Sequence, residues 1–167
     1  MRKYSGLLAV AALVTLVTGC GRSTEDNGTG SGTGALPTAA TLGKQVVLSV
    51  DEYLASAPYS DADRSEGEKQ AQICRACHSF DRGGPNMIGP ALHGFFGKEV
   101  GSRSGFEYSA VMRNANFVWT PEALNAWLAQ PGQFLPGNRM AFAGVLQQDD
   151  RDALIAYLLT ATMDGAD

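Results

Sequence analysis

Cys74-Arg75-Ala76-Cys77-His78 has the C-x-x-C-H spacing of covalent attachment to a c-type haem. Two thiols three positions apart can reach the two vinyl-derived carbons on one side of a porphyrin. The histidine that follows can reach the iron from the same face. We therefore expect Cys74 and Cys77 to hold one haem c covalently, with His78 as an axial ligand of its iron.

Two other kinds of site use paired cysteines, and the sequence favours neither of them. A structural zinc site needs four ligands, and beyond the motif only His93 is left to offer one. A thioredoxin-like redox pair needs a strand followed by a helix, a context that this sequence lacks. Haem attachment is therefore the preferred interpretation.

A haem that shuttles electrons needs a sixth ligand, whereas a haem that binds gas or peroxide needs an open position on the iron. Met140 is the candidate ligand, because Pro136-Gly137-Asn138-Arg139-Met140 is a loop that its glycine and proline can shape against the open haem face. The remaining methionines of this part of the chain fit roles as core filler or surface residues better. They are Met87, Met112 and Met163.

Length and composition fit one ordinary domain with extensions. The 167 residues are 44% hydrophobic and 18% charged, which is typical of a compact protein rather than a disordered one. Thirteen basic against seventeen acidic residues give a net charge of −4. The chain therefore lacks the excess of basic residues that would predict binding to nucleic acid. Three cysteines are too few for a disulfide scaffold.

The N-terminus has the layout of a secretory signal peptide: two basic residues precede an apolar run over residues 7–17. This run is shorter than the roughly 18 apolar residues of a membrane-spanning helix. Val17-Thr18-Gly19-Cys20 resembles the lipobox of bacterial lipoproteins. We expect removal of residues 1–19 and lipidation of Cys20, which places the chain on the periplasmic side of a bacterial membrane. A signal peptide cleaved elsewhere and an uncleaved anchor are the alternatives.

Residues 20–58 are the predicted tether between this lipid and the domain. Residues 21–34 read GRSTEDNGTGSGTG and contain nothing that could enter a core, so we expect them to be flexible. Residues 45–50 are apolar enough to pair or pack somewhere, and the sequence leaves the structure of 35–57 open. About 40 residues of flexible coil would reach about 35 Å.

Residues 59–163 form the predicted domain, which is all-α and has long loops rich in glycine and proline. A first helix starts at Asp61 or Asp63 and ends near His78. Within it, Gly67 and Ala71 could let another helix approach closely. A loop follows over residues 81–105, and then a short helix over 107–114.

Two further helices follow in the domain. Thr120-Pro121-Glu122 is a strong helix start, with a hydroxyl cap, a proline in the first turn and an acid near the positive end of the helix dipole. Pro131 stops this helix, and Leu124, Trp127 and Leu128 mark its buried face. Asp149 or Asp150 caps the last helix, whose expected apolar side is Leu154, Tyr157, Leu158 and Ala161.

Residues 59–162 resemble the class I cytochrome c family of mitochondria and bacteria. Beyond the haem motif, the resemblance is carried by Gly89-Pro90-Ala91-Leu92-His93-Gly94, Gly105-Phe106-Glu107-Tyr108-Ser109, Trp119-Thr120, Pro136-Gly137-Asn138-Arg139-Met140 and Asp152-Ala153-Leu154-Ile155-Ala156-Tyr157-Leu158. It implies the single-haem cytochrome c fold, in which helices and long loops wrap one covalently attached haem. It also implies an electron carrier rather than an enzyme, and it strengthens Met140 as the second axial ligand.

The same resemblance assigns roles to residues around the haem. It implies that the backbone carbonyl of Pro90 holds the imidazole proton of His78, which fixes the ring and its tautomer. Tyr108 and Trp119 are similar to the donors that the family directs to a haem propionate. On their own, both would be taken for core aromatics.

Two residues near the haem depart from the family pattern. Lys98 stands where the family usually has an arginine near a propionate, and a lysine offers a point charge instead of a planar fork. Trp127 stands where many members have a tyrosine close to the methionine sulfur, so one hydrogen bond to that ligand is expected to be missing.

The surface around the haem edge departs further. Mitochondrial members ring this edge with lysines that steer them to acidic partners. At the corresponding positions, only Arg139 keeps a charge. The others are Ile73, Met87, Gly132, Leu146 and Gln147. Scattered apolar surface residues are common, but several of them around one edge favour an apolar docking rim.

The sequence therefore predicts a monomeric monohaem electron carrier whose partners are respiratory or photosynthetic membrane complexes. It would take electrons from a quinol-oxidising cytochrome bc complex and pass them to a terminal oxidase. Two alternatives remain: a haem sensor or peroxidase with a labile sixth ligand, and a fixed cytochrome subunit of a larger oxidoreductase. Firm ligation by Met140 would separate the carrier from the sensor.

Overall fold

The structure is a computed structural model and describes residues 37–163 of the chain. The predicted signal peptide, the lipidation site Cys20 and the first part of the tether lie outside these residues. The helices in chain order are α1 (Val50–Leu54), α2 (Arg64–Arg75), α3 (Ala110–Asn114), α4 (Pro121–Ala129), α5 (Pro131–Phe134) and α6 (Gln148–Ala161).

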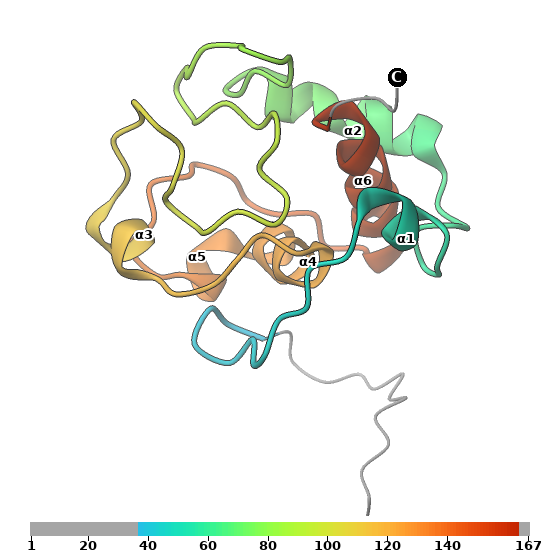
Figure 1. The fold of residues 1–167 in the computed structure, drawn as a ribbon, viewed down its shortest axis with the longest axis horizontal. Helices are drawn as coiled ribbons and strands as arrows, with labels where there is room; N and C mark the ends of the chain where they lie inside the picture. Colours follow the sequence, from blue (N-terminus) through green and yellow to red (C-terminus); the bar gives the residue numbers. More distant parts are fainter. Residues whose placement is uncertain (1–36, 164–167) are drawn as a thin grey trace, which may run out of the picture. The chain divides into compact units, whose positions relative to one another are not determined.

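The prediction of an all-α fold is confirmed (Figure 1). Over residues 37–163, β pairing is limited to one isolated antiparallel bridge between Glu99 and Val118. Long loops occupy the rest, including the predicted loop at 81–105. None of the helices in this described range has the length and apolarity needed to cross a bilayer.

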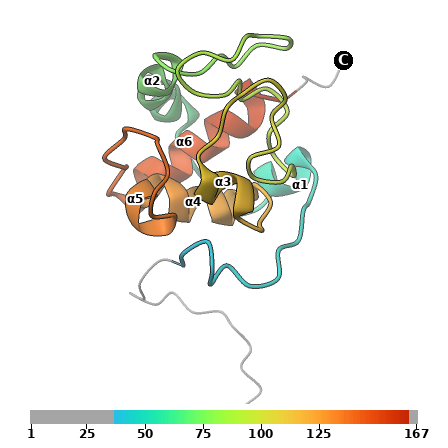
Figure 2. The same ribbon diagram turned by 90° about the vertical axis from the view of Figure 1, so that its left-hand side faces the viewer.

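The core is organised by α2 packing against α6, which lie side by side in both views (Figures 1 and 2). Gly67 and Ala71 are four residues apart on α2 and therefore share one face. A Cβ atom on Gly67 would stand 2.0 Å from the carbonyl oxygen of Ala153 on α6, and Ala71 is fully buried. The close approach that these two small residues allow is thus present.

Two predicted helix starts are confirmed, and one is wrong. The Asp63 carboxylate accepts hydrogen bonds from the first turn of α2, and the Thr120 hydroxyl accepts one from the backbone N–H of Ala123 in α4. By contrast, α6 begins after Gln147, so neither Asp149 nor Asp150 is its cap. Arg151 holds the chain that enters the helix, because its Nη1 donates to the carbonyls of Val145 and Leu146, both at 2.7 Å.

Residues 38–49, here called the strap, pack on the domain and do not belong to a tether. The side-chain amide of Gln45 pairs with the backbone of Val118, donating to its carbonyl at 2.7 Å and accepting from its N–H at 2.8 Å. The N–H of Ala39 donates to the carbonyl of Phe134 at 3.0 Å. The strap then leads into α1, whose Tyr53 is buried in the core.

The sequence placed the start of the domain at residue 59, and in the structure the preceding residues, from the strap to α1, also contact it. The apolar stretch at 45–50, whose structure the sequence left open, is held by the pairing of Gln45 with Val118 and by the bonds of the Tyr53 hydroxyl to the backbone of Val46 and Leu48. The side chains of Val46, Val47 and Leu48 stay largely exposed.

Candidate functional site

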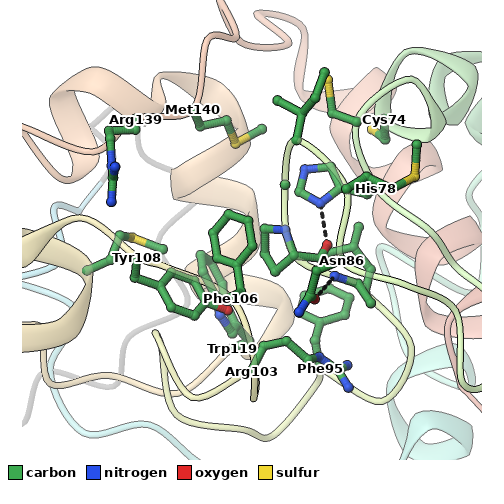
Figure 3. A pocket seen from close by; sticks show the side chains of 18 of the residues that line it. Cys74, His78, Asn86, Phe95, Arg103, Phe106, Tyr108, Trp119, Arg139 and Met140 are labelled. Atoms are coloured by element: carbon green, nitrogen blue, oxygen red, sulfur yellow. Dashed lines mark hydrogen bonds between the residues drawn. The ribbon is translucent and has the colours of Figure 1, made fainter.

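A cavity of about 890 Å³ opens between the end of α2, the loop that follows it, α4 and the loop before α6 (Figure 3). Every residue in the described range that the sequence assigned to the haem lines this cavity. They are Cys74, Cys77, His78, Pro90, Lys98, Tyr108, Trp119, Trp127 and Met140. Apolar side chains complete much of the wall, among them Leu92, Phe95, Leu124, Leu128 and Leu158.

The end of α2 delivers His78 to the cavity. The backbone N–H groups of Cys77 and His78 both donate to the carbonyl of Cys74, at 3.1 and 2.9 Å, so the chain turns tightly just after the helix. His78 Nδ1 lies 2.6 Å from the carbonyl oxygen of Pro90, the contact that the family resemblance implied. Because a carbonyl oxygen can only accept, Nδ1 carries the proton and Nε2 keeps a lone pair that can bind a metal.

The electrostatics of His78 favour the same state of the ring. Burial lowers the pKa of His78, and the hydrogen bond to the Pro90 carbonyl opposes that shift only in part. The imidazole is thus neutral at neutral pH, which is the form that binds iron.

Gly89 provides the room behind this imidazole. A Cβ atom at this position would stand 2.2 Å from Cε1 of His78, so any larger residue would push the ring out of place. The N–H of Gly89 donates to the carbonyl of Cys77 at 2.8 Å, which holds the two segments together. The sequence shows this glycine only as part of the family resemblance, because its role depends on close approach to His78 rather than on a special backbone angle.

Asn138 fixes the loop that carries Met140. Its Nδ2 donates to the carbonyls of Pro131 and Leu135 at 2.8 and 2.9 Å, and its Oδ1 accepts from the N–H of Met140 at 2.8 Å. Figure 3 shows the Met140 thioether facing the His78 imidazole across the cavity. Asn138 was not predicted, because a single polar residue in a loop carries no pattern of its own.

One end of the cavity gathers hydrogen-bond donors and positive charge. Tyr108 is buried there, with Trp119 half-buried beside it (Figure 3). Arg103, which sequence reasoning missed, lines the same end and donates to the carbonyl of His93. Burial raises the pKa of Tyr108, while the backbone contact and charge of Arg103 oppose the shift, so the phenol stays a protonated donor. Together with Lys98, this end suits a carboxylate such as a haem propionate.

Trp127 is part of a row of aromatic rings behind the cavity. Its indole meets Trp119 and Phe134 edge to face, with ring centroids 5.6 and 5.9 Å apart. Its role in this structure is therefore to wall the cavity through apolar contact.

The chemistry of the donor set fits a covalently bound haem better than the rival cysteine sites. Burial raises the pKa of the Cys74 thiol to about 11, whereas a thioredoxin-like thiol is activated by a lowered pKa. In the described part of the chain, no group of three or more histidine, cysteine or acidic residues is placed to hold a metal ion. Two thiols, a neutral imidazole, a facing thioether and a cationic end therefore line one cavity of the size of a cofactor site.

Comparison with known proteins agrees with this assignment. No protein-family model matches the chain. A protein from Bradyrhizobium diazoefficiens described as a cytochrome c homolog is 43% identical over 98 residues, which is 58% of this chain and 53% of that protein, so the chain spans about half of its length. Cytochrome c of Kluyveromyces lactis is 34% identical over 106 residues, covering 63% of this chain and 96% of the yeast protein. Cytochrome c2 of Blastochloris viridis is 36% identical over 110 residues, covering 66% and 87% respectively.

Proposed function

Since this chain belongs to the class I cytochrome c family, we propose that it is a lipid-tethered electron carrier on the periplasmic side of a bacterial membrane. It holds one covalently attached haem c. The observation that carries the proposal is the pairing of His78 and Met140 on facing walls of one cavity. Such a pair suits a haem with two fixed protein ligands, which favours electron transfer over the binding of gas or peroxide.

The haem iron supplies the one-electron chemistry by alternating between its ferrous and ferric states. The residues of the chain hold the two iron ligands in place during that exchange. The Pro90 carbonyl holds the His78 ring and its tautomer, and Asn138 holds the backbone beside Met140, so both ligands are preorganised. The apolar wall excludes water, and a methionine ligand together with a dry site favours a relatively high reduction potential.

The two rival functions make different demands. A haem sensor or peroxidase needs a sixth position that opens readily, and the three hydrogen bonds of Asn138 oppose movement of the Met140 loop. A fixed subunit of a larger oxidoreductase would stay with one complex through purification. A carrier would instead exchange between a quinol-oxidising complex and a terminal oxidase, the partners that we propose.

Lipidation of Cys20 is testable in cells. Cys20→Ser should move the cytochrome from the membrane fraction to the soluble periplasmic fraction, because the thiol that would accept the lipid is gone. Ser23→Ala, three residues on, should leave the distribution unchanged. Fractionation followed by haem staining measures both variants. A Cys20→Ser chain that stays membrane-bound and uncleaved would show that the apolar run at 7–17 is an anchor.

The predicted rim around the haem edge is exposed to solvent. Ile73 is 60% and Leu146 73% exposed, and Met87 lies at the surface as well. Ile88, which sequence reasoning did not include, is 80% exposed and adjoins Met87. We call Ile73, Met87, Ile88 and Leu146 the apolar rim, and we propose that it makes short-lived apolar contact with redox partners.

Electron transfer to and from native membranes tests both the carrier function and the rim. The membranes should reduce and reoxidise the added chain at rates that change only modestly between about 20 and 200 mM salt, because apolar contact is not screened. Leu146→Lys should slow transfer by about tenfold, equivalent to about 1.4 kcal/mol of docking free energy. Arg139→Gln should have a smaller effect, and Asn116→Lys controls for added charge at an exposed position outside the rim.

Two results would contradict these expectations. A chain that the membranes neither reduce nor reoxidise is not a carrier. A steep fall of rate with salt, with Arg139 the most sensitive position, would show that charge governs docking.

A further inference from the structure

The strap carries the second exposed apolar surface of the described residues. Val46, Val47 and Leu48 are 62%, 51% and 44% exposed, and the apolar rim accounts for the other large exposed hydrophobic residues. The two surfaces are separate. In Figures 1 and 2 the strap lies at the end of the domain opposite α2, the helix that carries Ile73 of the rim.

This exposure is built into the strap by its backbone contacts. The Tyr53 hydroxyl donates to the carbonyl of Val46 at 3.0 Å and accepts from the N–H of Leu48 at 3.1 Å. Gln45, next to Val46, is paired with the backbone of Val118. The backbone of the segment is thus fixed at Gln45, Val46 and Leu48. Val47 touches the domain at Gly97 with one methyl group, and about half of its surface stays exposed.

The charge of the strap differs from that of the whole chain. Lys44 is the one charged residue between positions 38 and 50, and acids begin at Asp51. The chain as a whole carries a net charge of −4. A short apolar segment with one basic residue and no acid suits the surface of a bilayer that contains anionic lipid.

We propose that Val46, Val47 and Leu48 rest on the lipid bilayer to which the tether attaches the chain. This inference rests on the proposed lipidation of Cys20. Residues 21–37 would then separate the lipid from the strap, and a flexible coil of that length spans about 23 Å. The strap is the first folded segment within reach of the bilayer, so even a weak apolar contact forms at a high effective concentration.

A lipid surface fits the strap better than a redox partner does. None of the three residues lines the haem cavity, so a protein docked on them would gain no access to the haem. Contact through the strap also leaves the end of the domain that carries α2 and Ile73 free for electron transfer (Figures 1 and 2). The strap would then fix the orientation of the domain on the bilayer, while the apolar rim contacts the redox partners.

A nitroxide spin label on a single added cysteine tests the contact. In the full, haem-loaded and lipidated chain, the native thiols are blocked, so Val46→Cys gives one labelling site. Ile88→Cys is the matched control, because both positions are exposed and carry β-branched residues. The chain is kept ferrous and low-spin, and hence diamagnetic, on vesicles of phosphatidylethanolamine and phosphatidylglycerol. Accessibility to oxygen and to a water-soluble nickel chelate is then measured for each label.

With vesicles, the label at 46 should lose accessibility to the nickel chelate several-fold and gain accessibility to oxygen, while the label at 88 stays unchanged. Failure of the chain to sediment with vesicles would overturn the tether and the strap contact together. A chain that sediments but keeps position 46 accessible to the chelate overturns the strap contact alone. Protection at 46 only on native membranes with their proteins would identify a protein partner and likewise overturn the lipid contact.

Discussion

Met140→Ala is expected to convert the ferric haem from low-spin to high-spin and to abolish the weak red absorption band that methionine–iron ligation gives. Alanine cannot reach the iron, so the sixth position becomes open to water and to added ligands. The reduction potential should fall, because the thioether favours the ferrous state. Absorption spectra and redox titration at neutral pH measure all of these changes.

Met112→Ala is the matched control for this prediction. Met112 lines the same cavity but belongs to α3, and its expected role is to fill space. This variant should keep the low-spin spectrum. The opposite pattern, with the band lost only in Met112→Ala, would move the ligand assignment to α3. A high-spin spectrum in the unaltered chain at neutral pH would instead favour the sensor function.

Gly67→Ala is expected to lower the free energy of unfolding by about 3 kcal/mol, near the upper end of the usual cost of overpacking. The added Cβ would stand 2.0 Å from the Ala153 carbonyl oxygen, and this contact is backbone that cannot rotate away. The helices α2 and α6 must then separate along their main contact. Only about 1 kcal/mol returns through the better helix propensity of alanine.

Thermal unfolding followed by circular dichroism measures this effect. A loss of this size corresponds to a fall in melting temperature of roughly 10 °C for a domain of about 125 residues. Gly132→Ala is the control: this residue lies in α5, and nothing stands within 4 Å of its would-be Cβ. Its melting temperature should stay the same or rise slightly. Equal stabilities of the two variants would mean that α2 and α6 are not held as closely as the structure has them.

The features that the sequence predicted correctly depend on neighbouring residues. The cap of α2 by Asp63 is fixed by its own next three residues, and the start of α4 by Thr120 and the proline that follows. The attachment motif is likewise five consecutive residues. In each case the interacting residues lie within about one helical turn of one another in the sequence. Their pattern can therefore be recognised without knowledge of the fold.

The features that the sequence did not predict depend on contacts between distant segments. Gln45 finds Val118 seventy-three positions away, so the sequence could not tell a strap from the end of a tether. Arg103 reaches the cavity only because its loop folds back beside Tyr108. The sequence offered Asp149 or Asp150 as the cap of the last helix, whereas α6 starts after Gln147, where Arg151 bonds to the carbonyls of the preceding loop.

The packing of α2 against α6 has a consequence for the order of events during the secretion that we propose. The attachment motif lies at the end of α2, and the helix that covers the inner face of α2 is the last one in the chain. In a chain that crosses the membrane from its amino end, the motif emerges well before α6. Until then the Gly67 face of α2 has no partner, so the two cysteines at the end of that helix are not yet enclosed. The domain can therefore complete its packing only after α6 has emerged, and the haem can be attached before α6 packs against α2.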